Sequence, residues 1–101
     1  MVEALSLEIR MVEKIATAAE IVDGVSFRLR TDQIIILNGM PPLEKGNEKD
    51  RKAAAKLKEF ILLKKVAYEA TEIDTMGRSK ANVKLDGLDI NKAMRDYIAT
   101  L

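Results

Sequence analysis

A single basic, amphipathic segment, flanked by short segments of strand period, most constrains the fold of this 101-residue chain. Between Glu48 and Leu63 apolar side chains recur at three- and four-residue spacing, which places them on one face of a helix. These side chains are Ala53, Ala54, Leu57, Phe60 and Ile61. The other positions are rich in Lys and Arg, so the pattern predicts a helix with one core-facing side and one basic side.

Two strands and a loop are predicted before this helix. Residues 26–30 alternate apolar and polar side chains, and a short turn separates them from the apolar run 34–37. Two prolines and a glycine in residues 38–42 predict a loop, because proline donates no ladder hydrogen bond and has a fixed φ.

The sequence does not decide between helix and strand in the first part of the chain. Residues 15–22 are rich in Ala, which favours a helix, but their Ile and Val ends and the Asp23-Gly24 turn that follows favour a strand. Residues 5–11 alternate apolar and polar side chains, so we expect an extra strand within an N-terminal extension that covers residues 1–14.

Two strands and a second helix are predicted after the basic helix. Residues 66–71 and 81–85 have strand period, and the Asp86-Gly87 pair is typical of a hairpin turn. A last helix is expected to begin at Asn91 as its cap. Its apolar stripe consists of Met94, Tyr97, Ile98 and Leu101.

The order of these elements predicts the fold class. Five core strands with a helix between the third and the fourth are typical of an OB barrel. We therefore expect residues 1–101 to form one domain, a five-stranded β-barrel with helices that is α+β by content.

Composition limits the chemistry. The chain has no Cys and no His, which excludes disulfides, thiolate metal sites and the commonest general base. Any reaction must use carboxylates, Lys, Arg, Tyr or hydroxyl groups.

The N-terminal residues predict location. Glu3, Glu8, Arg10 and Glu13 interrupt the apolar residues, a pattern that fits neither a signal peptide nor a membrane-spanning helix. We expect a soluble, cytoplasmic protein with no membrane partner.

Four motifs in a fixed order then indicate a family. They are Ala19-Glu-Ile-Val-Asp-Gly24, Leu37-Asn-Gly-Met-Pro-Pro-Leu-Glu44, Asp74-Thr-Met-Gly-Arg78 and Leu85-Asp-Gly-Leu-Asp-Ile-Asn91. In this order and spacing, over roughly residues 15–101, the chain resembles the staphylococcal nuclease-like (thermonuclease) family. The resemblance implies an OB barrel that cleaves phosphodiesters with one calcium ion, a Glu base and two Arg that neutralise the phosphate.

Carried over position by position, the resemblance implies a degenerate active site. The two metal-binding Asp of the family correspond to Val25 and Pro41, and its first Arg corresponds to Ile36. The catalytic positions that remain are Glu44 and Arg78. One well-placed Arg contributes on the order of 10³ in rate, and the metal contributes several kcal/mol more. We therefore expect these two residues to be insufficient for hydrolysis. A retained binding role and a plain salt bridge or solvated loop position are equally compatible with them.

The remaining oxygen ligands do not predict a metal site. Ser26 stands where the family's Thr offers a backbone carbonyl to the metal, and Met76 replaces a Tyr. Asp23, Asp32 and Glu44 could rebuild a site only weakly, because calcium prefers more anionic ligands than two carboxylates supply. We expect no cofactor, and calcium only if activity is retained.

A nucleic-acid-binding module is the leading hypothesis for function. Net charge is only +1, but residues 45–65 hold eight basic and three acidic side chains. The predicted binding residues are Arg28, Arg30, Lys45, Lys49, Lys52, Lys56 and Arg78. Single-stranded nucleic acid also needs stacking, yet Phe60, Tyr68 and Tyr97 lie on apolar stripes. The lysines are equally compatible with an ordinary solvated helix face.

Two other functions remain open. The barrel could be a protein-interaction or assembly scaffold, with a homodimer formed through residues 5–11, because an unpaired apolar edge strand tends to find a partner. The third possibility is a residual calcium-dependent phosphodiester hydrolase.

Overall fold

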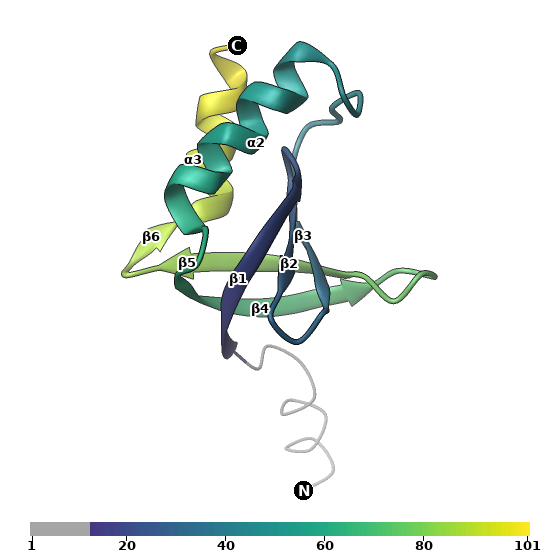
Figure 1. The fold of residues 1–101 in the computed structure, drawn as a ribbon, viewed down its shortest axis with the longest axis vertical. Coiled ribbons are helices and arrows are strands. Elements are labelled where there is room, and N and C mark those ends of the chain that lie inside the picture. The colour runs from purple at the N-terminus through teal and green to yellow at the C-terminus, as the bar shows by residue number, and fades with distance from the viewer. Residues whose placement is uncertain (1–12) are drawn as a thin grey trace, which may run out of the picture.

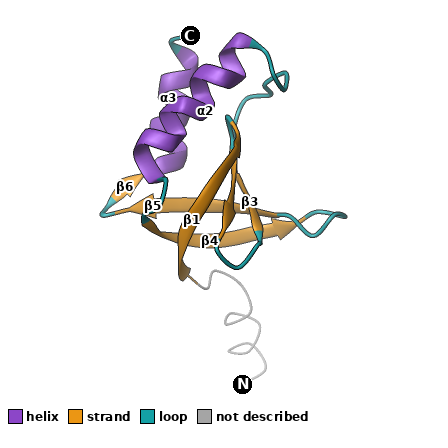
Figure 2. Cartoon of the chain, viewed as in Figure 1, coloured by secondary structure: helices purple, strands orange, loops and turns teal. Residues whose placement is uncertain are grey.

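The computed structural model describes residues 13–101, which contain six strands and two helices. The strands are β1 (Glu13–Asp23), β2 (Ser26–Leu29), β3 (Ile34–Leu37), β4 (Lys65–Ile73), β5 (Ser79–Leu85) and β6 (Leu88–Asp89). The helices are α2 (Glu48–Ile61) and α3 (Ile90–Ala99), which pack against each other at one end of the strands (Figures 1 and 2). The extra strand expected in residues 5–11 lies outside the described residues.

The first five strands close into a barrel. Neighbours in the order β3, β2, β1, β4 and β5 are antiparallel, and β3 also pairs in parallel with β5. In this parallel pair Ile36 lies beside Lys80. The barrel, the helix between its third and fourth strands and the C-terminal helix confirm the predicted OB-like architecture.

Strand β1 resolves the ambiguity of residues 15–22. Its first half, Glu13 to Thr17, pairs with β4, and its second half, from Ala18 onward, pairs with β2. Two register shifts in the second half mark irregularities that bend the strand from one neighbour to the other. These long-range pairings outweigh the helix propensity of the alanines, because intrinsic propensity is a weak preference.

Helix α2 begins where the sequence predicts and ends two residues before Leu63. The side chain of Asn47 caps it, because its Oδ1 accepts a hydrogen bond of 2.9 Å from the backbone N–H of Asp50. The core-facing side chains Ala53, Leu57 and Ile61 are fully buried, as the period predicts.

The prediction that Asn91 caps the last helix is wrong. Asp89 is the cap, and its Oδ1 accepts a hydrogen bond of 3.0 Å from the backbone N–H of Lys92. Asn91 lies in the first turn with 3% of its surface exposed, and it accepts from the backbone N–H of Val83 at 2.8 Å. It also donates to the carbonyl oxygens of Asn38 and Ala81. This buried Asn therefore joins α3 to the barrel wall.

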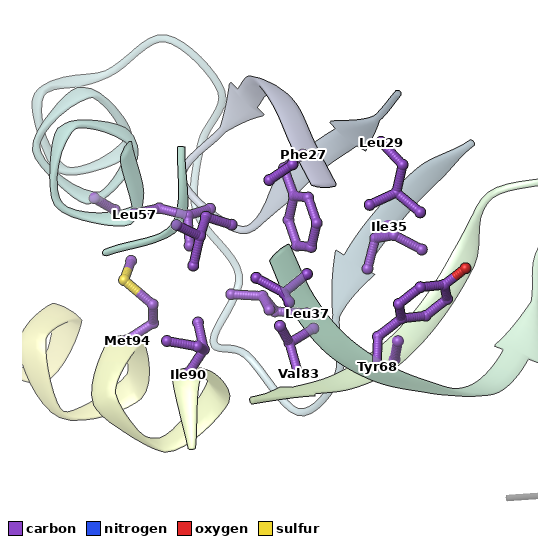
Figure 3. Close-up of a cluster of buried hydrophobic side chains, with 14 of the residues drawn as sticks. Phe27, Leu29, Ile35, Leu37, Leu57, Tyr68, Val83, Ile90 and Met94 are labelled. Atoms are coloured by element: carbon purple, nitrogen blue, oxygen red, sulfur yellow. The ribbon is translucent and has the colours of Figure 1, made fainter. Parts of the chain in front are cut away.

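The hydrophobic core fills the barrel and continues under the helices (Figure 3). Side chains from β2, β3, β4 and β5 line the barrel interior, and side chains from α2 and α3 close one end. The labelled members are Phe27, Leu29, Ile35, Leu37, Leu57, Tyr68, Val83, Ile90 and Met94. The helices are thus held by burial of their apolar stripes.

Asp50 in the first turn of α2 ties the helix to two loops. Its carboxylate accepts from the backbone N–H of Gly24 at 2.7 Å and of Gly46 at 2.8 Å, and only 7% of the residue is exposed. A Cβ on residue 24 would lie 2.8 Å from the Cβ of Ala53, so the turn between β1 and β2 requires glycine. These contacts fix the turn between β1 and β2 and the loop before α2 relative to the helix.

The Asp86-Gly87 turn connects β5 to β6 as the sequence predicts. Both residues have positive φ, 50° and 83°, which matches the twist of a tight hairpin. Within residues 13–101 no helix is long and apolar enough to cross a membrane.

Candidate functional site

The positions that the resemblance assigns to missing catalytic residues meet at one pocket. Val25, Ile36 and Pro41, which stand where the resemblance places the two metal-binding Asp and the first Arg, all line a cavity of about 240 Å³. Its walls come from the turn after β1, from β3, from the 38–43 loop and from β5. The structure therefore brings these sequence-distant positions together.

The pocket is lined mainly by apolar side chains, together with Asn38 and one charged side chain. Its side walls are Val25, Ile36, Leu37, Met40, Pro41, Pro42 and Leu43. Lys80 is the charged residue among the lining residues, because the β3–β5 register places it next to Ile36. Its Nζ lies 3.9 Å from Glu72 Oε2, and both side chains are exposed, so this ion pair is weak. None of its lining residues offers a divalent cation a carboxylate ligand.

Glu44 and Arg78, the retained catalytic positions, do not line this pocket. Glu44 is exposed in the loop before α2. Arg78 lies in the β4–β5 turn, where its Nε is 2.7 Å from Asp74 Oδ2. The structure thus shows Arg78 in a local ion pair.

Asp74 is held in its charged form by this turn. Partial burial raises the pKa of its carboxyl, but hydrogen bonds from the backbone N–H groups of Arg78 and Met76 and from the Arg78 guanidinium outweigh that effect. The net result is a pKa below the ordinary value. The carboxylate serves the turn as its principal acceptor.

Two of the three carboxylates considered for a rebuilt metal site are bound to neighbouring groups, and the third, Glu44, is exposed. Asp23 Oδ1 accepts from the backbone N–H of Val25 and from Ser26 Oγ, and Asp32 pairs with Arg28 at 2.9 Å. In residues 13–101, His, Cys, Asp and Glu form no cluster of three or more that could hold a metal ion.

The predicted basic residues lie on three separate parts of the molecule. Arg28 and Arg30 lie at the end of β2, where Arg28 pairs with both Glu20 and Asp32. Arg78 lies in the β4–β5 turn. The others lie in the loop before α2 or on α2 itself: Lys45, Lys49, Lys52 and Lys56.

The α2 lysines share a flank with two aromatic rings. Lys49, Lys52 and Lys56 follow one another at three- and four-residue spacing, so they line one side of the helix. The Nζ of Lys56 lies 5.7 Å from the ring centre of Phe60 and 5.2 Å from that of Tyr97 on α3. Phe60 and Tyr97 are half-buried, whereas Phe27 and Tyr68 lie in the core. We call these five residues, Lys49, Lys52, Lys56, Phe60 and Tyr97, the helical surface.

Sequence reasoning missed two residues that shape this end of the molecule. Lys80 follows the β4–β5 turn in a strand of mixed polarity, and only the parallel pairing with β3 reveals its place in the pocket. Asp50 sits on a basic helix, and its position three residues after Asn47 was the available signal, since acidic residues favour the first turn.

Comparison with protein-family models finds no match, and comparison with curated proteins finds none either. The resemblance to the staphylococcal nuclease-like family therefore stays a prediction that rests on the four motifs.

Proposed function

We propose that this chain is a nuclease-like OB module that no longer hydrolyses phosphodiesters and that binds single-stranded nucleic acid through the helical surface. The observation that carries the proposal is the row Lys49, Lys52 and Lys56 beside Phe60 and Tyr97. A basic track with aromatic rings next to it is the combination that binds single strands without strict sequence preference.

The lysines of this row are available for phosphates. Lys52 lies 3.9 Å from Glu48 and Lys56 lies 3.6 Å from Glu59, and all four side chains keep at least about a third of their surface exposed. Exposed pairs of this kind contribute about 0–1 kcal/mol, so phosphate can replace the carboxylate at little cost. By contrast, Arg28 and Arg78 are bound to carboxylates at 3.0 Å or less.

Phe60 and Tyr97 offer the stacking partner. Each ring keeps an accessible part while Lys56 lies over it, so a base that stacks there would displace the lysine toward a phosphate. Base–aromatic stacking contributes about 1–3 kcal/mol per base.

The pocket supports the proposed loss of hydrolysis. A phosphodiester transition state needs cations where charge develops, and three of the positions that the resemblance assigns to the metal ligands and the first Arg are the apolar Val25, Pro41 and Ile36, which leaves Lys80 as the cation among the lining residues. The resemblance is the basis for the proposed nuclease-like scaffold. Replacement of the catalytic positions at this pocket favours a binding role over a catalytic one.

The experiment is fluorescence anisotropy with labelled oligo(dT) and oligo(U) at several salt concentrations. The Lys49→Gln/Lys52→Gln double variant should lower the slope of log affinity against log salt by about 1.4, because each lost phosphate contact on a single strand contributes about 0.7. Tyr97→Leu should weaken binding without changing that slope.

The matched control is Lys14→Gln/Lys84→Gln, which removes two exposed lysines from β1 and β5 and changes net charge equally. It should leave the slope nearly unchanged. The proposal fails if the protein binds neither oligonucleotide at low salt, or if the control pair weakens binding as much as the helical pair.

A further inference from the structure

The sequence contains a single Asn-Gly pair, Asn38-Gly39, and both residues line the pocket. The side-chain amide of an Asn can be attacked by the backbone nitrogen of the residue that follows it. Glycine permits this attack most readily, because it has no Cβ to hinder the approach. Gly39 is exposed and has a φ of 73°, so its nitrogen lies in an open turn. The pair therefore combines a reactive sequence with an accessible backbone.

Hydrogen bonds hold the backbone of Asn38 and leave the two reacting groups unengaged. The N–H of Asn38 donates to the carbonyl of Ala81 at 2.9 Å, and its carbonyl accepts from Asn91 Nδ2 at 2.9 Å. Within residues 13–101, neither the side-chain amide of Asn38 nor the N–H of Gly39 forms a hydrogen bond. The Gly39 nitrogen can therefore attack without first giving up a hydrogen bond.

The three other asparagines of the chain lack this combination. The N–H of Val83, which follows Asn82, donates to the side chain of Asn91 at 2.8 Å. The N–H of Lys92, which follows Asn91, donates to the side chain that caps α3 at 3.0 Å. Asn47 caps α2, and its own Oδ1 accepts a hydrogen bond of 2.9 Å. These asparagines therefore serve as controls within the same molecule.

Arg95 on α3 brings a positive charge to the Asn-Gly pair. A Cβ on Gly39 would lie 3.4 Å from Arg95 Nη1, so the guanidinium lies next to this glycine. The neighbouring Asp96 is bound to Lys92 at 2.8 Å, and Arg95 forms no ion pair with any residue that the structure describes. A nearby cation favours both the deprotonated backbone nitrogen and the negatively charged oxygen that forms during the attack.

We propose that Asn38 is a site of spontaneous deamidation, which Arg95 accelerates. The Gly39 nitrogen loses its proton and bonds to Asn38 Cγ, the bond from Cγ to the side-chain nitrogen breaks, and ammonia leaves a cyclic imide. Water then opens the imide at either carbonyl, which yields Asp or isoaspartate at position 38. The product adds a carboxylate to the lining of the pocket and lowers the net charge by one from +1. The reaction uses no residue of the helical surface, so this proposal and the proposed function can fail independently.

Peptide mass spectrometry of the purified protein, kept for several weeks at mildly alkaline pH, tests the proposal. We expect the peptide that contains residue 38 to gain about 1 Da, because an amide NH₂ becomes a carboxyl OH. Its product should contain isoaspartate as well as Asp, since both arise from the imide. The peptides that contain Asn47, Asn82 and Asn91 should react about tenfold more slowly or less. No gain in mass at residue 38, or equal rates at the four asparagines, overturns the proposal.

Variants separate the Asn-Gly pair from the charge beside it. Gly39→Ala should slow the reaction about tenfold or more, because a Cβ hinders the attacking nitrogen. Arg95→Gln should slow it about threefold, since a charge near the surface has a modest effect, and Arg95→Lys should recover part of the rate. Lys92→Gln, the matched control, removes one exposed positive charge from the same helix and should leave the rate unchanged.

Circular dichroism checks that each variant remains folded. An unchanged rate in Gly39→Ala or in Arg95→Gln overturns the proposal, and so does equal slowing by Lys92→Gln.

Discussion

At the scale of single residues, three aspartate carboxylates stabilise turns and loops by accepting backbone hydrogen bonds. Asp23 accepts from the N–H of Val25, Asp50 from the N–H of Gly24, and Asp74 from the N–H of Met76. An acidic residue beside a glycine turn resembles a metal ligand in sequence, yet here its lone pairs are taken by the backbone. The distinction depends on which groups surround each carboxylate in space.

The buried carboxylate of Asp50 gives the first prediction. Asp50→Ala should lower the free energy of unfolding by about 2–4 kcal/mol, because it leaves the N–H groups of Gly24 and Gly46 without their charged acceptor. Asp50→Asn keeps one acceptor oxygen and should lose less. Urea unfolding measures both losses. A loss below about 1 kcal/mol for Asp50→Ala would contradict a stabilising role for the hydrogen bonds from Gly24 and Gly46.

Asp74 gives a prediction about pH. Its folded-state pKa lies below the ordinary value, so the stabilisation it gives the turn is present above about pH 3.9 and is lost as pH falls through the lower folded pKa. An NMR titration should give a carboxyl midpoint below about 3.9, with the amide signals of Met76 and Arg78 shifting at the same midpoint.

The control for this titration is Arg78→Gln. It should raise the midpoint only in part, because the backbone N–H groups of Met76 and Arg78 still donate to Asp74. A wild-type midpoint at or above the ordinary value contradicts the prediction.

Among the elements, local patterns predict those whose neighbours are local. The period of α2 and the turn at Asp86-Gly87 are encoded within a few residues, and the structure confirms both. Strand β1 and Asn91 depend on segments far along the chain: β1 on β4, and Asn91 on Asn38. For the same reason the sequence identified positions at the pocket only through the family resemblance and did not identify Lys80.

The observed cap of α3, Asp89, and the residue that the sequence predicted as its cap, Asn91, give a prediction for this element. Asp89→Ala should cost about 1 kcal/mol, which is typical for loss of an N-cap. Asn91→Ala should cost about 2–4 kcal/mol, because it leaves the N–H of Val83 and the carbonyl of Asn38 without their side-chain partner, while the carbonyl of Ala81 keeps the N–H of Asn38. Chemical denaturation measures the loss of unfolding free energy in each variant. A larger loss for Asp89→Ala than for Asn91→Ala would contradict the structural role described for Asn91.

For the whole molecule, the barrel fold does not determine which side chains stand at the catalytic positions. The OB-like scaffold closes through β3 and β5, while the positions that would carry catalysis present Val25, Ile36 and Pro41 to the pocket. A fold of this kind does not by itself specify an activity. In the proposed function, binding depends on the helical surface and not on these positions.

Calcium gives the prediction at this scale. Millimolar calcium should leave Tm unchanged within about 1 °C, because a ligand raises Tm only when it binds the folded state, and the positions that the resemblance assigns to metal ligands are apolar. Magnesium at the same concentration is the control for ionic strength. A saturable rise in Tm that Glu44→Gln abolishes would show a rebuilt metal site.

The parallel pair that closes the barrel also determines how the chain must reach this state. Ile35 meets Ser79 only after the intervening chain, including α2 and β4, has been arranged, so this contact, like the still longer-range pair of β1 with β4, carries a large loop-closure entropy. We therefore expect the β3–β5 pair to form late in folding. Substitutions at Leu37 or Ala81 should accelerate unfolding far more than they slow folding. Stopped-flow measurement of both rates tests whether this strand pair forms late.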